Sequence, residues 1–180
     1  MREELDLKLV EKYPLIFKDR HAPMNQTAMC WGFSHGDGWY NIIDTLCVLL
    51  YSKYNQAKDR YDYAKECLDT KGGKTDWGKP VTAEEVEEKR LKMEEEAAKV
   101  PVAAQVKEKF GGLRFYVHAA TEEHYNYITF AESMSYRTCE TCGAPGTYYP
   151  FGWHHVACDE HASEEDKENL KEYRDEAMDT

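Results

Sequence analysis

Apolar residues recur mostly at three- and four-residue spacing from about Trp39 to about Leu68, and this pattern predicts a helix with one core-facing stripe. Helices rarely run this long without interruption, so we expect a break near residues 52–55. Further helices are expected at residues 2–12, which end before Pro14, and at residues 122–136. The stripe of the long helix consists of Ile42, Ile43, Leu46, Leu49, Leu50, Ala57, Tyr61, Ala64 and Leu68.

A second helical stretch covers residues 82–99, where Thr82 and Glu85 have the spacing of an N-terminal capping box. This stretch is dense in Glu and Lys and has a weak apolar stripe, so we expect a solvated arm lying across the domain. Together with the Gly- and Pro-containing residues before it, it forms a charged helical insertion at about residues 69–99. The C-terminal residues 162–180 are also strongly polar and predict an acidic helical tail.

Residues 113–118 alternate between apolar and polar side chains, which predicts a half-buried strand. The segment before them, residues 101–110, fits two interpretations. As a strand it forms a hairpin through a two-residue turn at Gly111-Gly112, and as a helix it ends at these glycines. The β-branched, proline-led start favours the strand, whereas Glu108 on its apolar face counts against it, so both interpretations stay open.

The sequence from Cys139 to His161 has the spacing of a metal site: Cys-x2-Cys, fifteen residues, then Cys-x2-His. Each close pair fits one tight turn, and thiolates with an imidazole are the ligands that tetrahedral Zn²⁺ prefers. Because four protein ligands leave no open position for a substrate, we expect a structural zinc ion. The expected ligands are Cys139, Cys142, Cys158 and His161.

Either His154 or His155 could replace His161 as the fourth ligand. We favour His161 because its spacing from Cys158 repeats the spacing of the first pair. Redox thiols would leave the second pair unexplained, and a disulfide framework is disfavoured because the other cysteines occur singly.

Taken together, these elements predict an α+β fold, with helices packed on a small antiparallel hairpin or sheet and a C-terminal zinc knuckle. We expect residues 1–138 to form the α+β domain that carries the insertion. Residues 139–161 should form the zinc-binding knuckle packed on it, followed by the acidic tail.

The formal net charge of −11 for 180 residues argues against binding to bulk nucleic acid, because the chain as a whole repels phosphate. The longest apolar run is too short for a membrane span, and the N-terminus lacks the apolar segment of a signal peptide. We therefore expect a cytoplasmic protein with no membrane partner.

A local excess of positive charge surrounds the two glycines of the expected hairpin. Lys107, Lys109 and Arg114 could neutralise a phosphate or carboxylate, and Tyr116 and His118 could stack on a flat ligand. This set predicts a site for a small anionic, nucleotide-like ligand. The alternative is an ordinary strand with a charged, solvated outer face.

A second candidate site lies in the stretch Ser-His-Gly-Asp-Gly-Trp-Tyr, directly before the long helix. His35, Asp37 and Trp39 are candidate ligand-binding residues, because the start of a helix attracts anions. The alternative is that Asp37 caps the helix while the aromatic residues pack the loop on the core.

Three stretches carry a family resemblance: GFSHGDGWYNIIDTLC, QVKEKFGGLRFYV, and AESMSYRTCETCGAPG followed by W-x4-C-x2-H. In this order they resemble a family of small, largely uncharacterised proteins of bacteriophages and prophages. The resemblance covers roughly Tyr13–Tyr51 and Val100–His161. It implies an accessory factor that acts on host or defence machinery inside a bacterial cell, and it supplies no catalytic residues.

The expected function is therefore that of a non-catalytic, zinc-stabilised binding protein, with either a host or defence protein or a small anionic ligand as its partner. The alternative is a hydrolase acting on nucleotides or nucleic acid, which would use the Gly-Asp-Gly-Trp loop and the basic set.

Overall fold

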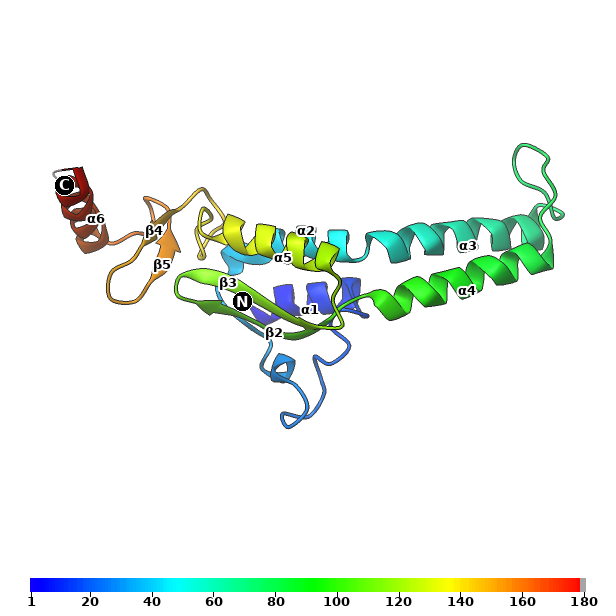
Figure 1. The fold of residues 1–180 in the computed structure, drawn as a ribbon, viewed down its shortest axis with the longest axis horizontal. Coiled ribbons are helices and arrows are strands. Elements are labelled where there is room, and N and C mark those ends of the chain that lie inside the picture. The colour runs from blue at the N-terminus through cyan, green and yellow to red at the C-terminus, as the bar shows by residue number, and fades with distance from the viewer. Residues whose placement is uncertain (179–180) are drawn as a thin grey trace.

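A small sheet with helices around it forms the centre of the computed structural model, which describes the backbone of residues 1–178 and the side chains of residues 1–173. The fold is α+β, as the sequence predicts (Figure 1). The helices are α1 (Glu3–Lys12), α2 (Tyr40–Leu50), α3 (Ser52–Thr70), α4 (Ala83–Lys99), α5 (Glu122–Ser135) and α6 (Glu164–Met178). The strands are β1 (Phe33–Ser34), β2 (Val102–Lys109), β3 (Gly112–His118), β4 (Thr147–Tyr149) and β5 (His155–Ala157). Short 3₁₀ turns occupy Ala28–Trp31 and Asp37–Trp39.

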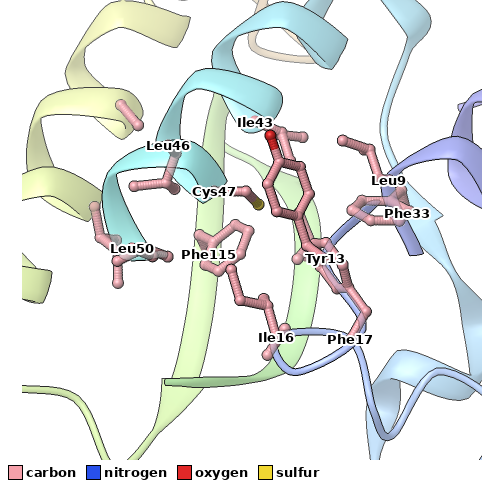
Figure 2. Packing of buried hydrophobic residues seen from close by; sticks show 14 of the residues in the cluster. Leu9, Tyr13, Ile16, Phe17, Phe33, Ile43, Leu46, Cys47, Leu50 and Phe115 are labelled. Atoms are coloured by element: carbon pink, nitrogen blue, oxygen red, sulfur yellow. The ribbon is translucent and has the colours of Figure 1, made fainter. Parts of the chain in front are cut away.

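The core forms where α1, α2 and α5 meet the hairpin of β2 and β3. Helix α2 buries Ile43, Leu46 and Leu50, three members of the predicted stripe, while Phe115 contributes from the sheet (Figure 2). The expected break in the long helix lies at Tyr51, just before the predicted position. The Tyr51 hydroxyl accepts the backbone N–H of Leu15 at 2.6 Å, which ties this junction to the segment after α1.

Helix α5 packs one face against the core. Its buried residues are His124, Ile128, Ala131 and Ser135, whereas the large side chains of Tyr125 and Phe130 are exposed. The Ser135 hydroxyl accepts the N–H of Leu113 at 2.8 Å, so this face of the helix also forms a hydrogen bond with the start of β3.

Residues 102–109 form a strand, which resolves the ambiguity of this segment. The turn is Phe110-Gly111 rather than the predicted Gly111-Gly112, since Lys109 pairs with Gly112. From Gln105 to Lys109 the register differs from the expected one by two residues, and an even shift keeps these side chains on their predicted face. An irregularity between Ala103 and Gln105 reverses the alternation before it, so Ala103 is buried opposite Val117. Glu108 is accommodated on the apolar side because its carboxylate accepts the Gly111 N–H at 2.6 Å.

Strand β1 was not predicted, because its short sequence lies in a stretch rich in turn residues. It pairs in parallel with β2, with Phe33 opposite Val106 and Ser34 opposite Lys107. This pairing fixes the following loop, residues 35–39, beside the hairpin.

Helices α3 and α4 pair into an arm that projects away from the sheet (Figure 1). The prediction that the charged helix lies across the domain was therefore wrong, because its weak apolar stripe packs on α3 instead. The arm has its own small cluster of Ala64, Cys67 and Val81. Thr82 caps α4 by accepting the N–H of Glu85, whose carboxylate pairs with Lys89 instead of completing the capping box.

At the opposite end of the molecule lie β4, β5 and α6 (Figure 1). The acidic tail is helical through Met178, and its last residues, 179–180, lie outside the described part of the chain. Across the described residues, the helices lack the combination of length and apolar character that crossing a bilayer requires.

Candidate metal centre and its docking

The four residues expected to bind metal lie together at the C-terminal end of the fold. The ligand atoms of Cys139, Cys142, Cys158 and His161 all lie within 4.8 Å of one another. The Sγ atoms of Cys142 and Cys158 are 3.7 Å apart, and Nδ1 of His161 lies 3.1 Å from Sγ of Cys158 and 3.7 Å from Sγ of Cys139. The cysteines are free thiols rather than disulfides, so the group can hold a metal ion.

Two tight turns bring the ligand pairs together. In the first, the Gly143 N–H donates to the carbonyl of Cys139 at 2.9 Å, and Gly143 has a φ of 80°, a conformation that favours glycine. In the second, His161 donates to the Cys158 carbonyl at 3.0 Å. The segment between the two ligand pairs contains the antiparallel strands β4 and β5, and Cys158 directly follows β5.

The environment of Cys139 favours the thiolate form that metal binding requires. Burial raises the pKa of this thiol, but the backbone N–H groups of Cys142 and Cys158 act against burial, and the pKa is lowered overall. Cys139 is buried, whereas Cys142 and His161 are exposed, so one side of the cluster faces the protein and the other faces solvent.

The other two histidines of this region point to different partners. Nδ1 of His154 lies 2.5 Å from the Tyr148 hydroxyl. His155 stacks on the Tyr149 ring, and its Nε2 lies 3.4 Å from a carboxylate oxygen of Asp166 in α6. His161 is therefore the histidine that completes the cluster, as its spacing predicts.

The Gly-Asp-Gly-Trp loop docks directly against the first ligand pair. The Gly38 N–H donates to the Glu140 carbonyl at 2.7 Å, and the indole N–H of Trp39 donates to the Thr138 carbonyl at 3.0 Å. A Cβ atom at Gly38 would lie 2.1 Å from the carbonyl oxygen of Cys139. Glycine is thus required here by close contact between two backbones.

Glu140 adds a side-chain contact to the same interface. Its carboxylate accepts the N–H of Gly36 at 2.8 Å. Burial raises the pKa of Glu140, and the Gly36 hydrogen bond partly opposes that shift. The loop and the first ligand pair are therefore joined by hydrogen bonds to both backbone and side chain.

The three candidate ligand-binding residues of this loop are engaged within the fold. Trp39 is fully buried, and Asp37 forms an ion pair with Arg2 and accepts the Arg2 N–H at 2.7 Å. His35 is 7% exposed, and burial lowers its pKa to about 4. Its Nδ1 lies 2.7 Å from the Gly36 carbonyl, while Nε2 is buried and has no hydrogen-bond partner among the described side chains and backbone groups. These contacts engage all three side chains within the fold, so the three residues do not form an open ligand-binding surface.

The hairpin turn forms a second contact with the metal segment. A Cβ atom at Gly111 would lie 2.7 Å from the Tyr148 ring and 3.1 Å from the His155 nitrogen. The metal segment, residues 139–161, is therefore held between the loop of residues 35–39 and the tip of the hairpin. The basic set and the Gly-Asp-Gly-Trp loop are linked through this segment and through the pairing of β1 with β2.

The residues of the basic set differ in how far they are engaged. Arg114 donates to the Tyr136 hydroxyl at 3.0 Å and to the Leu113 carbonyl at 2.7 Å. Lys107 lies over the Tyr116 ring, with 5.9 Å from Nζ to the ring centroid. Lys109, Tyr116 and His118 are exposed. Arg114 therefore supports the sheet. The outer face of the hairpin presents the side chains of Lys107, Lys109, Tyr116 and His118.

The sequence did not indicate that Thr138 and Glu140 accept the hydrogen bonds of residues 35–39, which we call the docking loop. They contribute mainly backbone carbonyls, which every residue type carries, so composition and spacing could not mark them. The available signal was the pair of glycines around Asp37, which indicates a close approach of backbones without naming the partner.

Comparison of the chain with protein-family models, with curated proteins and with solved structures gave no match.

Proposed function

We propose that the cluster of Cys139, Cys142, Cys158 and His161 binds one Zn²⁺ in a structural role. In a tetrahedral site with ordinary Zn–S and Zn–N bonds, the sulfur–sulfur distance is about 3.8 Å and the sulfur–nitrogen distance about 3.5 Å. Three of the pairs in the cluster lie 3.1 Å to 3.7 Å apart, and these distances agree with this geometry. Three thiolates and one imidazole also match the donor preference of zinc.

The protein with this ion bound is a non-catalytic binding protein. The observation that carries this proposal is the position of the cluster between the docking loop and the hairpin tip. There, four protein ligands close the coordination sphere and leave no open position for a substrate. The ion instead stabilises the surface formed by the docking loop and the hairpin tip. His35 and Asp37, which a hydrolase would require, already have structural contacts, so the hydrolase gains no support from the fold.

The binding surface of this proposal is the outer face of the hairpin, formed by Lys107, Lys109, Tyr116 and His118. Among the described side chains, neither of these lysines forms an ion pair, whereas Lys89, Lys92 and Lys99 of the arm all pair with glutamates. Unpaired cations in a chain of net charge −11 attract an anionic ligand or an acidic patch on a protein. The motif resemblance alone supports the setting, an accessory phage factor in the bacterial cytoplasm that acts on a host or defence protein.

Native mass spectrometry of protein purified from bacterial cells tests this function. One zinc ion per chain is expected, together with either a small anion released on denaturation or a co-purifying protein. The variant with Lys107→Glu and Lys109→Glu should keep the zinc and lose the partner. The matched variant with Lys89→Glu and Lys92→Glu on the arm should keep both.

A folded wild-type chain without metal would contradict the structural zinc. Equal retention of the partner by both charge-reversal variants would contradict the binding surface. The two parts of the proposal can therefore fail separately.

A further inference from the structure

The turn of the hairpin carries a bulky residue in a conformation that normally excludes one. Phe110 has a φ of 54° and Gly111 a φ of 77°, so both central residues of this two-residue turn are left-handed. Such turns favour Asn, Asp or Gly at the first position, because a larger side chain strains the backbone there. Phe110 is also 63% exposed, so core packing does not account for its presence. A strained, exposed aromatic residue is characteristic of functional positions.

Phe110 lines a cavity of about 390 Å³ between the hairpin tip and the loop that joins β4 to β5. The lining residues are Glu108, Lys109, Phe110, Gly152, Trp153 and His154. Trp153 is 79% exposed, so a second large aromatic side chain faces solvent at the same place. Small-molecule sites commonly reach this volume and combine aromatic walls with a few polar groups.

The two walls of the cavity are held in position by the contacts described for the metal segment. Gly111 packs on the Tyr148 ring and the His155 backbone, and this contact fixes the hairpin tip against the loop. The His154 ring lies edge-on to the Phe110 ring, with 6.3 Å between centroids, while its Nδ1 lies beside the Tyr148 hydroxyl. The aromatic wall is therefore built into the fold.

The polar groups of the cavity define the chemistry of its ligand. Among the described side chains Lys109 forms no ion pair, and its Nζ lies 5.4 Å from the centroid of the Phe110 ring. Lys107 follows on the same face of β2, two residues away. One carboxylate oxygen of Glu108 accepts the Gly111 N–H, and the carboxylate can also accept N–H groups from a ligand edge. Because this carboxylate repels a phosphate, the anionic part of the ligand has to lie on the lysine side.

We propose that this cavity binds a nucleotide, either free or as part of a single strand. The base stacks on Phe110 and Trp153, its N–H edge faces Glu108, and its phosphate lies against Lys109. Base stacking on aromatic side chains combined with a phosphate-facing lysine is the usual chemistry of single-strand and nucleotide recognition. This inference deepens the proposed function and rests on it for the binding role of the hairpin.

The test is titration calorimetry of the metal-loaded protein with three probes: adenosine 5′-monophosphate, a six-residue deoxyadenosine oligonucleotide and inorganic phosphate. We expect the mononucleotide, the oligonucleotide or both to bind more tightly than phosphate. Trp153→Ala should weaken this binding about 10-fold. Trp77→Ala changes another largely exposed tryptophan, 86% accessible at the far end of the arm, and should leave the affinity unchanged.

Phe110→Gly separates the binding role from a structural one. Glycine relieves the left-handed strain, so this variant should have a higher denaturation midpoint and at the same time weaker nucleotide binding. Phe110→Asn, which also tolerates this conformation, should behave in the same way. Lys109→Ala should weaken binding and reduce its dependence on salt.

Several results would overturn the inference. These are failure of both nucleotide probes to bind, equal binding of phosphate, equal loss of affinity in Trp77→Ala and Trp153→Ala, or loss of stability in both Phe110 variants. Retained zinc and retained capture of a partner alongside such a result would leave the proposed function standing. A preference between the mononucleotide and the oligonucleotide would identify the source of the ligand.

Discussion

The α3–α4 arm and the metal segment, residues 139–161, lie at opposite ends of the central sheet, and each has little apolar core of its own (Figure 1). The arm is held by helix pairing, a small apolar cluster and surface ion pairs along α4. The metal segment brings four potential ligand atoms together for the proposed ion, and glycine contacts join it to the docking loop and the hairpin tip. Stability in the arm is thus distributed over many weak contacts, whereas in the metal segment it depends on a few.

Metal removal should produce the largest difference between the two regions. Structural zinc sites contribute about 10–16 kcal/mol of apparent binding free energy in small zinc-finger peptides, and that free energy is also folding free energy. Treatment of the protein with a chelator should therefore abolish amide protection within residues 139–161 while the amides of α3 and α4 stay protected. Hydrogen exchange followed by mass spectrometry measures both regions in one experiment.

Cys142→Ser should reproduce the effect of the chelator, because it removes one ligand. Cys30→Ser serves as the matched control, since Cys30 lies outside the cluster and its thiol donates to the Thr27 carbonyl at 3.1 Å. Unchanged protection of residues 139–161 after metal removal would show that docking contacts alone hold this segment.

Two glycine substitutions compare the packing of the regions directly. Gly38→Ala forces a Cβ atom against the Cys139 carbonyl and should destabilise the protein by about 2–4 kcal/mol. Gly78→Ala in the arm places its Cβ in open space but at a φ of 79°, so only backbone strain of about 1 kcal/mol is expected. Urea denaturation of both metal-loaded variants measures the two effects, and the reverse order would refute the docking interpretation.

Acid should weaken the docking loop through His35. Burial lowers the pKa of this histidine from 6.5 to about 4, so between these values the unfolded chain binds a proton that the folded chain does not. Stability is therefore unaffected by this group above pH 6.5, falls as the pH drops toward 4, and loses about 3 kcal/mol in all. The midpoint of urea denaturation measured from pH 7 to pH 4 gives this dependence.

His35→Gln should flatten that part of the pH profile, because the neutral amide does not titrate. His118→Gln, at an exposed position of β3, should keep the profile of the wild type. Metal ligands also take up protons in acid, so the informative quantity is the difference between the two variants at each pH. Identical profiles would exclude His35 as the acid-sensitive group.

The smallest effect is expected from a single ion pair of the arm. Arg90 pairs with both Glu87 and Glu94 on the exposed face of α4. Solvent and salt screen such contacts, so Arg90→Ala should shift the denaturation midpoint little, and less at high salt. A loss as large as that of Gly38→Ala would show that the arm also depends on a few contacts.

Local patterns predicted much of this architecture. The three- and four-residue periodicity located α2 and α3, the alternation of residues 113–118 located β3, and cysteine spacing identified the four residues of the cluster. Each of these patterns records one element or one tight turn, and such information is contained in neighbouring residues.

Contacts between distant segments could not be predicted in the same way. The parallel pairing of β1 with β2 and the docking of Gly38 on Glu140 depend on backbone groups, which are the same in every residue. The turn at Phe110-Gly111 escaped prediction because phenylalanine is disfavoured in a left-handed conformation, so the adjacent glycine pair was the more favourable choice.

The hydrogen bond between Gly36 and Glu140 joins residues 104 positions apart in the chain. At ordinary rates of translation, about 5–20 residues per second, the docking loop leaves the ribosome roughly 5–20 s before its partner. During this interval the loop has neither Glu140 nor Thr138 to accept its N–H groups, and the ligands are not yet synthesised. Docking of this loop is therefore a late event in the synthesis of each new chain, and so is binding of the proposed zinc ion, because its last ligand, His161, follows Glu140 in the chain.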